Sequence, residues 1–180
     1  KYDAMGLIRH LYHPKVPGED LFAKHYRNPG EERFEVSSKP KSLIFIYVES
    51  LETTYQNSQL FGHNLLNEFS RITTPHISFP KFIQTKGADW TIGGVVASQC
   101  GIPLKLLTIF DSNHFGENVR QFLAGATCLS DVLKTKGYYN VFLKGSSLHF
   151  AGFNLFLKAH HYDQFYGKDE WLNQGFNEQD

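Results

Sequence analysis

The sequence has no long hydrophobic run and no excess of either charge. None of its apolar stretches approaches the roughly 20 residues that a membrane-spanning helix needs. Lysine plus arginine and aspartate plus glutamate number 18 each, so nothing in the composition indicates a surface for nucleic acid or another polyanion. A length of 180 residues corresponds to one domain or to part of a larger one.

Several familiar catalytic signatures are also missing. The chain has no glycine-rich phosphate loop, no Rossmann glycine fingerprint and no Gly-x-Ser-x-Gly elbow, which disfavours nucleotide binding and ordinary serine hydrolase chemistry. Its nine histidines include no His-Glu-x-x-His motif. We therefore expect most of them to be surface or packing residues.

Only two cysteines are present, Cys100 and Cys128. An even number is typical of a single disulfide in an oxidising compartment, where such a bond would contribute roughly 3 kcal/mol to stability. Two buried free thiols fit the sequence equally well. The residues alone leave both alternatives open.

Residues 1–40 differ from the rest of the chain, because turn-forming prolines and glycines alternate there with charges and short apolar pieces. We interpret them as an approach or linker segment with one short helix near 18–26, and residues 41–180 as the folded unit. The polar stretch 173–180 closes no strand or helix pattern, so we expect a truncation within a longer protein. A targeting or membrane segment is likewise expected upstream of Lys1.

From residue 41 onward, strand and helix patterns alternate. Residues 42–48 form a continuous apolar run, typical of a strand covered on both faces of a parallel sheet. Further strands are expected at 78–84 (interrupted by Pro80), 138–145 and 162–166, with helices at 59–70, 91–100, 129–137 and 148–160 and mostly loop over 105–127. This order predicts an α/β domain with a largely parallel sheet.

Within residues 87–94, one threonine follows an acid and a tryptophan and is followed closely by two glycines. Thr91 opens an expected helix, so its hydroxyl could cap that helix and stabilise it by about 1 kcal/mol. Alternatively Thr91 could be a nucleophile, activated by a metal ion and by the positive end of the helix. Gly93 and Gly94 would then let a phosphate approach the amides of the first turn.

Polar residues follow two of the expected strands. Glu49 comes directly after the first, where α/β sheets place ligands, and could hold a metal or cap a helix. Lys144 lies near the end of the strand expected at 138–145, and Ser146 directly follows that strand. Lys144 could supply a charge for a phosphate and Ser146 a substrate contact, or both could belong to an ordinary turn.

Several of these stretches together resemble the sulfatase-like domain of bacterial phosphoglycerol transferases. The similarity lies in residues 44–52, 74–77, 87–94 and 98–103, and runs on through 128–133 and 150–152 to 166–167. These enzymes modify periplasmic glucans and are relatives of lipoteichoic acid synthase within the alkaline phosphatase superfamily. The resemblance implies a three-layer alkaline-phosphatase-like α/β fold, of which this chain would hold the N-terminal portion.

The resemblance also implies roles for particular residues. Glu49 falls on a metal ligand and Thr91 on the residue that is both ligand and nucleophile, with Mn²⁺ the usual metal and Mg²⁺ a substitute. Thr91 would attack the phosphorus of the phosphatidylglycerol head group, release diacylglycerol, and pass the glycerophosphate to a glucan hydroxyl or to water. The implied location is the periplasmic face of the inner membrane, reached through an upstream anchor, and it favours a disulfide between Cys100 and Cys128.

The chain departs from the family in two ways. The family completes its metal site with a downstream Asp-His pair, whereas here Asp163 follows His161 in the reverse order, so we expect the missing ligands beyond Asp180 and little activity from this chain alone. Lipoteichoic acid synthases place a histidine and an acid where Lys144 and Ser146 stand, so recognition of the head group is expected to differ.

Two other functions remain as alternatives. One is a hydrolase of the same superfamily, either a sulfatase or a phosphodiesterase, although the Cys/Ser-x-Pro-x-Arg setting of sulfatases is absent around Thr91. The other is a non-catalytic module that binds glucan or lipid. No nucleic-acid partner is expected under any of these hypotheses.

Overall fold

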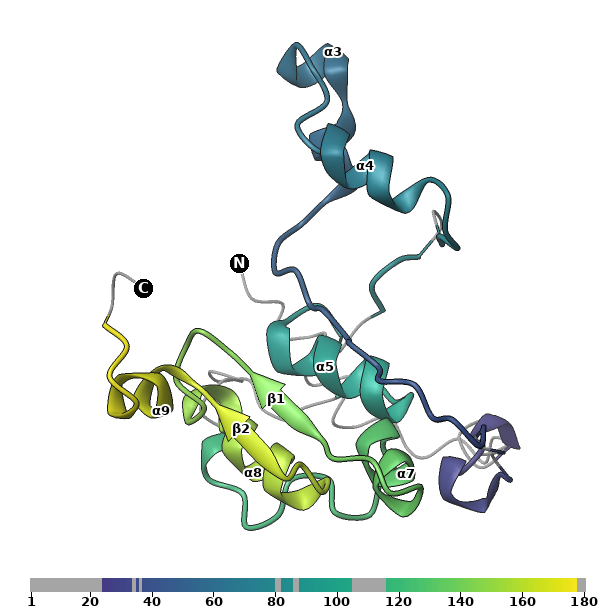
Figure 1. The fold of residues 1–180 in the computed structure, drawn as a ribbon, viewed down its shortest axis with the longest axis vertical. Helices are drawn as coiled ribbons and strands as arrows, with labels where there is room; N and C mark the ends of the chain where they lie inside the picture. The colour runs from purple at the N-terminus through teal and green to yellow at the C-terminus, as the bar shows by residue number, and fades with distance from the viewer. Residues whose placement is uncertain are drawn as a thin grey trace, which may run out of the picture.

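The computed structural model describes residues 24–33, 35, 37–79, 82–85, 88–104 and 116–177. Figure 1 shows a packed part, which contains both strands and the helices α5, α7, α8 and α9, and an arm that carries α3 and α4 away from it. The elements in chain order are η1 Pro29–Glu31, η2 Thr53–Gln56, α3 Ser58–Phe61, α4 Asn67–Thr73, α5 Thr91–Cys100, α7 Leu129–Thr135, β1 Val141–Leu143, η3 Phe150–Gly152, α8 Phe153–Ala159, β2 Gln164–Tyr166 and α9 Lys168–Asn173.

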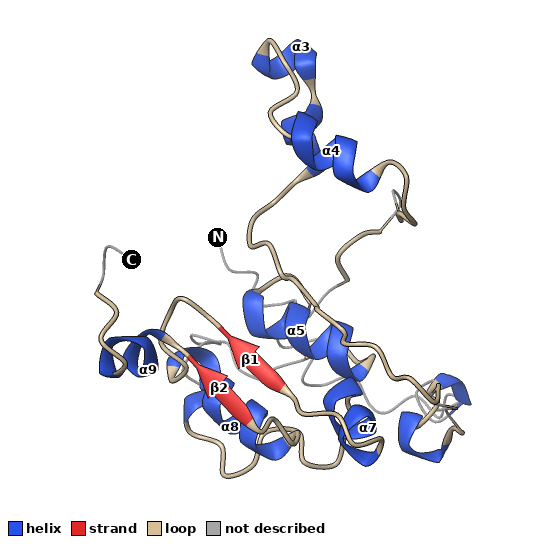
Figure 2. Cartoon of the chain, in the orientation of Figure 1, coloured by secondary structure: helices blue, strands red, loops and turns tan. Residues whose placement is uncertain are grey.

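The sheet described consists of two parallel strands joined by a helical crossover. β1 pairs with β2 in the register Val141 to Gln164, Phe142 to Phe165 and Leu143 to Tyr166. η3 and α8 lie between the two strands in the sequence, and the ring of Phe153 packs 5.7 Å from that of Phe142. This strand–helix–strand unit, visible in Figure 2, confirms the α/β class predicted from the sequence.

One hydrophobic core joins α5 and α8 and includes Cys128, the residue before α7. Its fully buried members include Ile92 and Val96 from α5 and Phe156 and Leu157 from α8, all 0% exposed. A disulfide between Cys100 and Cys128 ties the last residue of α5 to the residue that precedes α7. The covalent link and the core therefore hold the start of α5 in a defined place relative to the sheet.

Most helices and strands predicted for the packed part are present. The helix expected at 91–100 is α5, and those expected at 129–137 and 148–160 contain α7 and α8. The strands expected at 138–145 and 162–166 contain β1 and β2. Gly101 follows α5 with φ 68° and Gly137 lies just beyond α7 with φ 82°, the left-handed conformation that glycine adopts most easily.

The strand predicted at 42–48 is wrong for the chain as described. These residues run extended, but their backbone forms no hydrogen bond to another described residue, and Leu43 to Val48 are 41–81% exposed. A strand is defined by its ladder, and no neighbouring strand pairs with this run within the described residues. The apolar pattern correctly predicts extended backbone, but no strand that pairs with residues 42–48 is among the described residues.

The single helix predicted at 59–70 is also wrong. Gly62, with φ 79°, ends α3 in the left-handed region, and α4 begins only at Asn67. At 78–84 the described residues form no strand, while Pro80 and Lys81 lie outside them. Most of the helix expected near 18–26, and much of the loop expected at 105–127, also lie outside the described residues.

Two broader points complete the fold. No helix within the described ranges is long and apolar enough to cross a membrane. The division into residues 1–40 and 41–180 stays a prediction, because residues 1–23 are not described.

Candidate functional site

Thr91 is the first residue of α5 and does not cap it. The N-cap is Trp90, whose backbone is extended and whose side chain makes no capping bond. The Thr91 hydroxyl forms no hydrogen bond to another described residue. The capping alternative is therefore wrong, and the hydroxyl is left available at the positive end of the helix.

The two glycines after Thr91 are not equivalent. The amide of Gly94 donates to the carbonyl of Trp90 at 2.8 Å, so it is already used by the helix. The amide of Gly93 precedes that first bond and has no acceptor within the helix. A Cβ on Gly94 would lie 3.6 Å from the carbonyl oxygen of Ala88, an ordinary contact, so crowding does not require a glycine there.

Four of the six predicted ligand or substrate residues line one cavity of about 1060 Å³, namely Glu49, Thr91, Lys144 and Ser146. One wall is formed by residues 40–47, which include most of the extended run 42–48, and another by residues 138–143, which include β1. Val95 and Gln99 of α5 also line the cavity. Gly93 and Gly94 are not among the lining residues.

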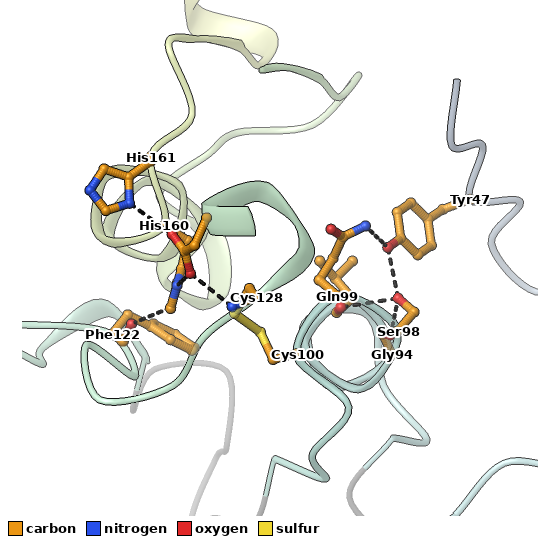
Figure 3. The surroundings of a disulfide bond; sticks show 11 residues. Tyr47, Gly94, Ser98, Gln99, Cys100, Phe122, Cys128, His160 and His161 are labelled. Carbon is orange, nitrogen blue, oxygen red and sulfur yellow. Dashed lines mark hydrogen bonds and ion pairs between the residues drawn. A yellow bond between two sulfur atoms is a disulfide. The ribbon is translucent and has the colours of Figure 1, made fainter. Parts of the chain in front are cut away.

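Tyr47 anchors the extended run that carries Glu49. The Ser98 hydroxyl donates to the carbonyl of Gly94 at 2.8 Å, so the Tyr47 hydroxyl donates to Ser98 Oγ at 2.7 Å. Tyr47 in turn accepts from Gln99 Nε2 at 2.9 Å. Figure 3 shows this chain of bonds along one side of α5. The sequence analysis missed Tyr47 and Gln99 because both lie inside apolar patterns.

Glu49 stands where the run ends and the chain turns. The next residue, Ser50, has φ 56°, a left-handed conformation that is costly for a residue with a side chain. Glu49 is exposed and forms no hydrogen bond to another described residue, and the helix that follows is preceded by Glu52 instead. Its carboxylate therefore caps no helix that the structure describes and lies at the lining of the cavity.

Lys144 follows β1 and has a rigidly held backbone. Its amide donates to the carbonyl of Tyr166 at 2.8 Å, and its carbonyl accepts from Trp171 Nε1 at 3.1 Å. The ammonium Nζ is buried without a hydrogen-bond partner among the described residues, and lies 3.8 Å from the centre of the Phe153 ring.

The surroundings of Lys144 suit an anion. Burial lowers the pKa of the Lys144 ammonium, while the negative charge of Glu49 raises it, and the net result is a pKa below the ordinary value. The faces of Phe153 and Phe150 stabilise the cation only in part, because an ammonium has three protons to donate. A phosphate entering the cavity would provide the missing acceptors.

Glu49 and Thr91, the two residues predicted to hold a metal, both line this cavity. A carboxylate and a hydroxyl are oxygen donors of the kind that Mn²⁺ and Mg²⁺ prefer. No other acid and no histidine lines this cavity among the described residues. The chain thus offers two oxygen donors toward a divalent cation here.

A second group of side chains has metal-like spacing, away from this cavity. Ligand atoms of Cys128, Asp131 and His160 lie within 4.8 Å of one another, so the group could hold an ion by distance. The sulfur of Cys128, however, is bonded to Cys100, as Figure 3 shows, and a disulfide sulfur is not the thiolate that binds metals.

Asp131 gives this second group a structural role. Its carboxylate accepts from His160 Nδ1 at 2.9 Å, His161 Nδ1 at 2.8 Å and the amide of Cys128 at 2.8 Å. Burial raises the pKa of Asp131, but these hydrogen bonds outweigh burial and hold the pKa below its ordinary value. His160, 1% exposed, also reaches the carbonyl of Phe122, so the network joins α7, α8 and that loop.

The sequence analysis missed this network. The available signal was an acid three residues after Cys128 at a helix start, a spacing typical of a capping box. The two histidines that complete it lie 29 and 30 residues further along the chain, and only the fold brings them to Asp131.

The fold and the site together define an α/β protein with a free hydroxyl, a carboxylate and a buried ammonium around one cavity. Comparison with known proteins finds phosphoglycerol transferase I from Salmonella typhimurium, Salmonella newport and Salmonella arizonae, each 39% identical over 153 residues. The match covers 85% of this chain and 19% of each relative, so the chain spans about a fifth of the length of the curated relatives it matches.

Over that stretch, the similarity to phosphoglycerol transferase I confirms the resemblance to bacterial phosphoglycerol transferases that the sequence implied. No model of a protein family matches the chain. No solved structure matches it either.

Proposed function

We propose that these residues form the nucleophile-bearing part of an enzyme that transfers phosphoglycerol from phosphatidylglycerol to a hydroxyl of a periplasmic glucan. The observation that carries the proposal is the unbonded hydroxyl of Thr91 at the start of α5, in one cavity with Glu49 and Lys144. The name of the relatives, phosphoglycerol transferase I, supports the same chemistry. A location at the periplasmic face of the membrane follows from this donor and acceptor.

The transfer takes place in two displacements. Thr91 Oγ forms a bond to the phosphorus as the bond to the diacylglycerol oxygen breaks, which leaves a glycerophospho-threonine. A glucan hydroxyl then attacks the same phosphorus and releases Thr91. A divalent cation held in part by Glu49 and Thr91, with Mn²⁺ preferred and Mg²⁺ possible, would neutralise charge on the phosphate and favour the ionised hydroxyl.

The remaining residues position the phosphate. The Lys144 ammonium, unpartnered among the described residues, donates to the non-bridging oxygens. Ser146, exposed in the same cavity, offers a hydroxyl to the glycerol, and the amide of Gly93 adds the partial positive charge of the helix start. We assign Gly94 no contact with the phosphate, because its amide is bonded to Trp90 and it does not line the cavity.

The test uses a chimera in which this chain replaces the matching fifth of the Salmonella typhimurium relative. With phosphatidylglycerol labelled in its head group, Thr91→Ala is expected to lower turnover by about 10³-fold or more. Mass spectrometry of the unsubstituted chimera should find one glycerophosphoryl group on Thr91. The matched control is Thr135→Ala in α7, whose hydroxyl bonds only to a helix carbonyl, and it should keep full turnover.

Each other outcome has a defined meaning. Unchanged turnover in the Thr91→Ala chimera would show that Thr91 is not the nucleophile. Label released as free glycerophosphate, with none on glucan, would establish a hydrolase instead of a transferase. Lys144→Met should raise the KM for phosphatidylglycerol, whereas Lys158→Met on the exposed side of α8 should leave the KM unchanged.

A further inference from the structure

Cys128, Asp131 and His160, the second group of side chains described above, have no part in the proposed transfer. Their ligand atoms lie within 4.8 Å of one another. Cys128 and His160 are 0% and 1% exposed, and Asp131 is partly buried. Ligands of a single tetrahedral zinc ion, each ~2.0–2.3 Å from the metal, lie about 3.3–3.8 Å apart. A contraction of roughly 1 Å would therefore let these three residues hold one ion.

Two of the three side chains are already oriented as metal ligands are. His160 Nε2 donates to the carbonyl of Phe122 at 3.1 Å, which directs Nδ1 toward Asp131 Oδ2 at 2.9 Å. His161 Nδ1 donates to the other carboxylate oxygen of Asp131 at 2.8 Å. Metal-binding histidines and carboxylates are held in this way, through hydrogen bonds made by the atoms that do not bind the metal. A zinc ion would replace the proton that His160 Nδ1 donates to Asp131.

The disulfide is the feature that excludes a metal from this group. Cys128 Sγ is bonded to Cys100 Sγ, and Figure 3 shows the bond between α5 and the chain before α7. Reduction would free both sulfurs, so that two thiolates, one imidazole and one carboxylate could surround an ion. That set of four ligands suits tetrahedral zinc, because thiolates favour zinc over Mn²⁺ and Mg²⁺. The cavity with Glu49 and Thr91 offers oxygen donors only and therefore differs in the metal it selects.

A second cavity gives a reductant a route to the disulfide. This cavity, of about 470 Å³, lies at the last turn of α5, and Cys100 is one of its lining residues. Arg27 and Lys136 also line it, and no acid does among the described residues, so it attracts an anionic thiolate. Attack on Cys100 Sγ would release Cys128 as a thiolate beside Asp131 and His160.

We propose that two-electron reduction of the disulfide turns this group into a zinc site with Cys100, Cys128, Asp131 and His160 as ligands. The reductant is a dithiol, whose first thiolate bonds to Cys100 Sγ as the bond to Cys128 Sγ breaks. Its second thiol then displaces it from Cys100, and the reductant leaves as a disulfide. Zn²⁺ displaces the two thiol protons and the Nδ1 proton of His160. The inference does not depend on the chemistry proposed above, because zinc binding requires no phosphoglycerol.

A zinc titration of the 180-residue chain tests the proposal. The chain is reduced with dithiothreitol, which is then removed in the absence of air. The reduced chain should bind one Zn²⁺ at least about 100-fold more tightly than the oxidised chain, since only the reduced chain offers thiolates. Equal zinc affinities of the oxidised and reduced chains would show binding by surface histidines alone and would overturn the proposal.

A pair of acid substitutions tests the carboxylate ligand. Asp131→Asn should weaken zinc binding by the reduced chain by about tenfold or more, because it removes an anionic ligand. The matched control is Asp169→Asn in α9, whose carboxylate accepts from the Ser147 hydroxyl, and it should bind zinc as the unsubstituted chain does. Equal affinities in the two variants would remove Asp131 from the site.

Cobalt reports the ligands directly, without a substitution that disturbs the core. Tetrahedral Co²⁺ bound by thiolates has strong d–d absorption and a sulfur-to-cobalt charge-transfer band, whereas Co²⁺ on surface imidazoles and carboxylates has neither. We expect both bands in the reduced chain and neither in the oxidised chain. A reduced chain that binds Co²⁺ without them would contradict the assignment of the two cysteines.

Urea denaturation shows whether the site belongs to the folded chain. Zinc should raise the urea midpoint of the reduced chain and leave that of the oxidised chain unchanged, because it binds the folded, reduced state. A lower midpoint would mean that only unfolded cysteines and histidines bind zinc, and this outcome would overturn the proposal. Loss of turnover in the Thr91→Ala chimera leaves zinc binding unaffected, so the proposed function and the zinc site can fail separately.

Discussion

Two regions of this chain have similarly apolar sequence patterns, but only one of them buries its apolar side chains. Residues 88–104 and 116–177 form a core in which Ile92, Phe156 and Leu157 are 0% exposed. Residues 37–79 contain no buried residue at all, although α4 and the run 42–48 carry several large apolar side chains. The difference teaches that a local pattern can set the backbone conformation, whereas burial requires a partner surface.

What distinguishes the packed region is the number of links between distant segments. The disulfide joins α5 to α7, and Asp131 joins α7 to His160 and His161. The extended run has two such links, from Tyr47 to α5 and from the Tyr138 hydroxyl to the carbonyl of Lys41 at 3.1 Å. These side-chain bonds hold the run beside the cavity without covering it.

The largest contrast should come from removing one phenylalanine in each region. Phe156→Ala should lower the free energy of unfolding of the 180-residue chain by about 3–5 kcal/mol, because it leaves a cavity in the core. Phe69→Ala in α4, where the side chain is 46% exposed, should cost less than about 1 kcal/mol. Urea denaturation measures both, and equal losses would show that α4 packs in solution as tightly as α8.

Removing the disulfide should have the next largest effect. Cys100 and Cys128 are 28 residues apart, and closing a loop of that size stabilises the folded state by roughly 3–4 kcal/mol in the chain-entropy estimate. A variant with both Cys100→Ser and Cys128→Ser should unfold at correspondingly lower urea and should be indifferent to reductant, unlike the unsubstituted chain. If reductant does not change the stability of the unsubstituted chain in urea, the disulfide does not contribute to the difference between the packed region and residues 37–79.

The Asp131 network should give a smaller loss that depends on pH. Asp131→Asn removes hydrogen bonds to a charged group and should cost about 2 kcal/mol at neutral pH. The pKa of Asp131 is lower in the folded state than its ordinary 3.8, so this stability is fully present above that value and is lost as the pH falls through the lowered folded pKa. The difference in free energy of unfolding between the unsubstituted chain and Asp131→Asn should therefore become smaller below about pH 4. Measuring stability as a function of pH checks this.

The matched control for Asp131 is the ion pair of Glu68 with Arg71 on the arm. Its side chains are 72–73% exposed, so Glu68→Gln should change stability by less than about 0.5 kcal/mol at any pH. If the loss of stability caused by Asp131→Asn became larger toward acid pH, the pKa of Asp131 could not be lowered in the folded state.

Apart from the control variants, the smallest effect should be a gain in stability. Gly94→Ala replaces a glycine inside α5 where a Cβ meets only an ordinary contact with Ala88, so it should stabilise the chain by about 0.5–1 kcal/mol. Thermal unfolding would show this as a higher Tm. A lower Tm would mean that the start of α5 is more crowded in solution than the described residues indicate.

The sequence was sufficient where local signals and packing agree. The start of α5 at Thr91 followed from its composition, its end from Gly101, and the βαβ order of the packed part from alternating patterns. Four residues predicted from the sequence also line one cavity, although Glu49, Thr91 and Lys144 are spread over almost a hundred positions of the chain. Those predictions rested on the position of each residue at the end of a strand or the start of a helix, where ligands gather.

The sequence failed where the outcome depends on what lies across from a segment. The apolar run 42–48 fits a buried strand by every local measure, yet its ladder needs a neighbour that the described residues do not contain. The stripe of α4 likewise predicted a buried face that no described element covers. The network of Asp131 with its two histidines was not predicted, because hydrogen bonds between residues far apart in the chain leave no periodic pattern in the sequence.

By itself, the sequence determined most helices and strands of the packed part and placed a threonine hydroxyl at the start of α5, because glycine, proline and apolar spacing act over a few residues. Only the tertiary structure decided that this hydroxyl does not cap the helix and that its cavity also holds the Lys144 ammonium, which has no hydrogen-bond partner among the described residues. The same holds for the run 42–48, which pairs with no described strand beside β1. Those features arise from contacts between residues far apart in the chain, and such contacts depend on how the core brings the segments together.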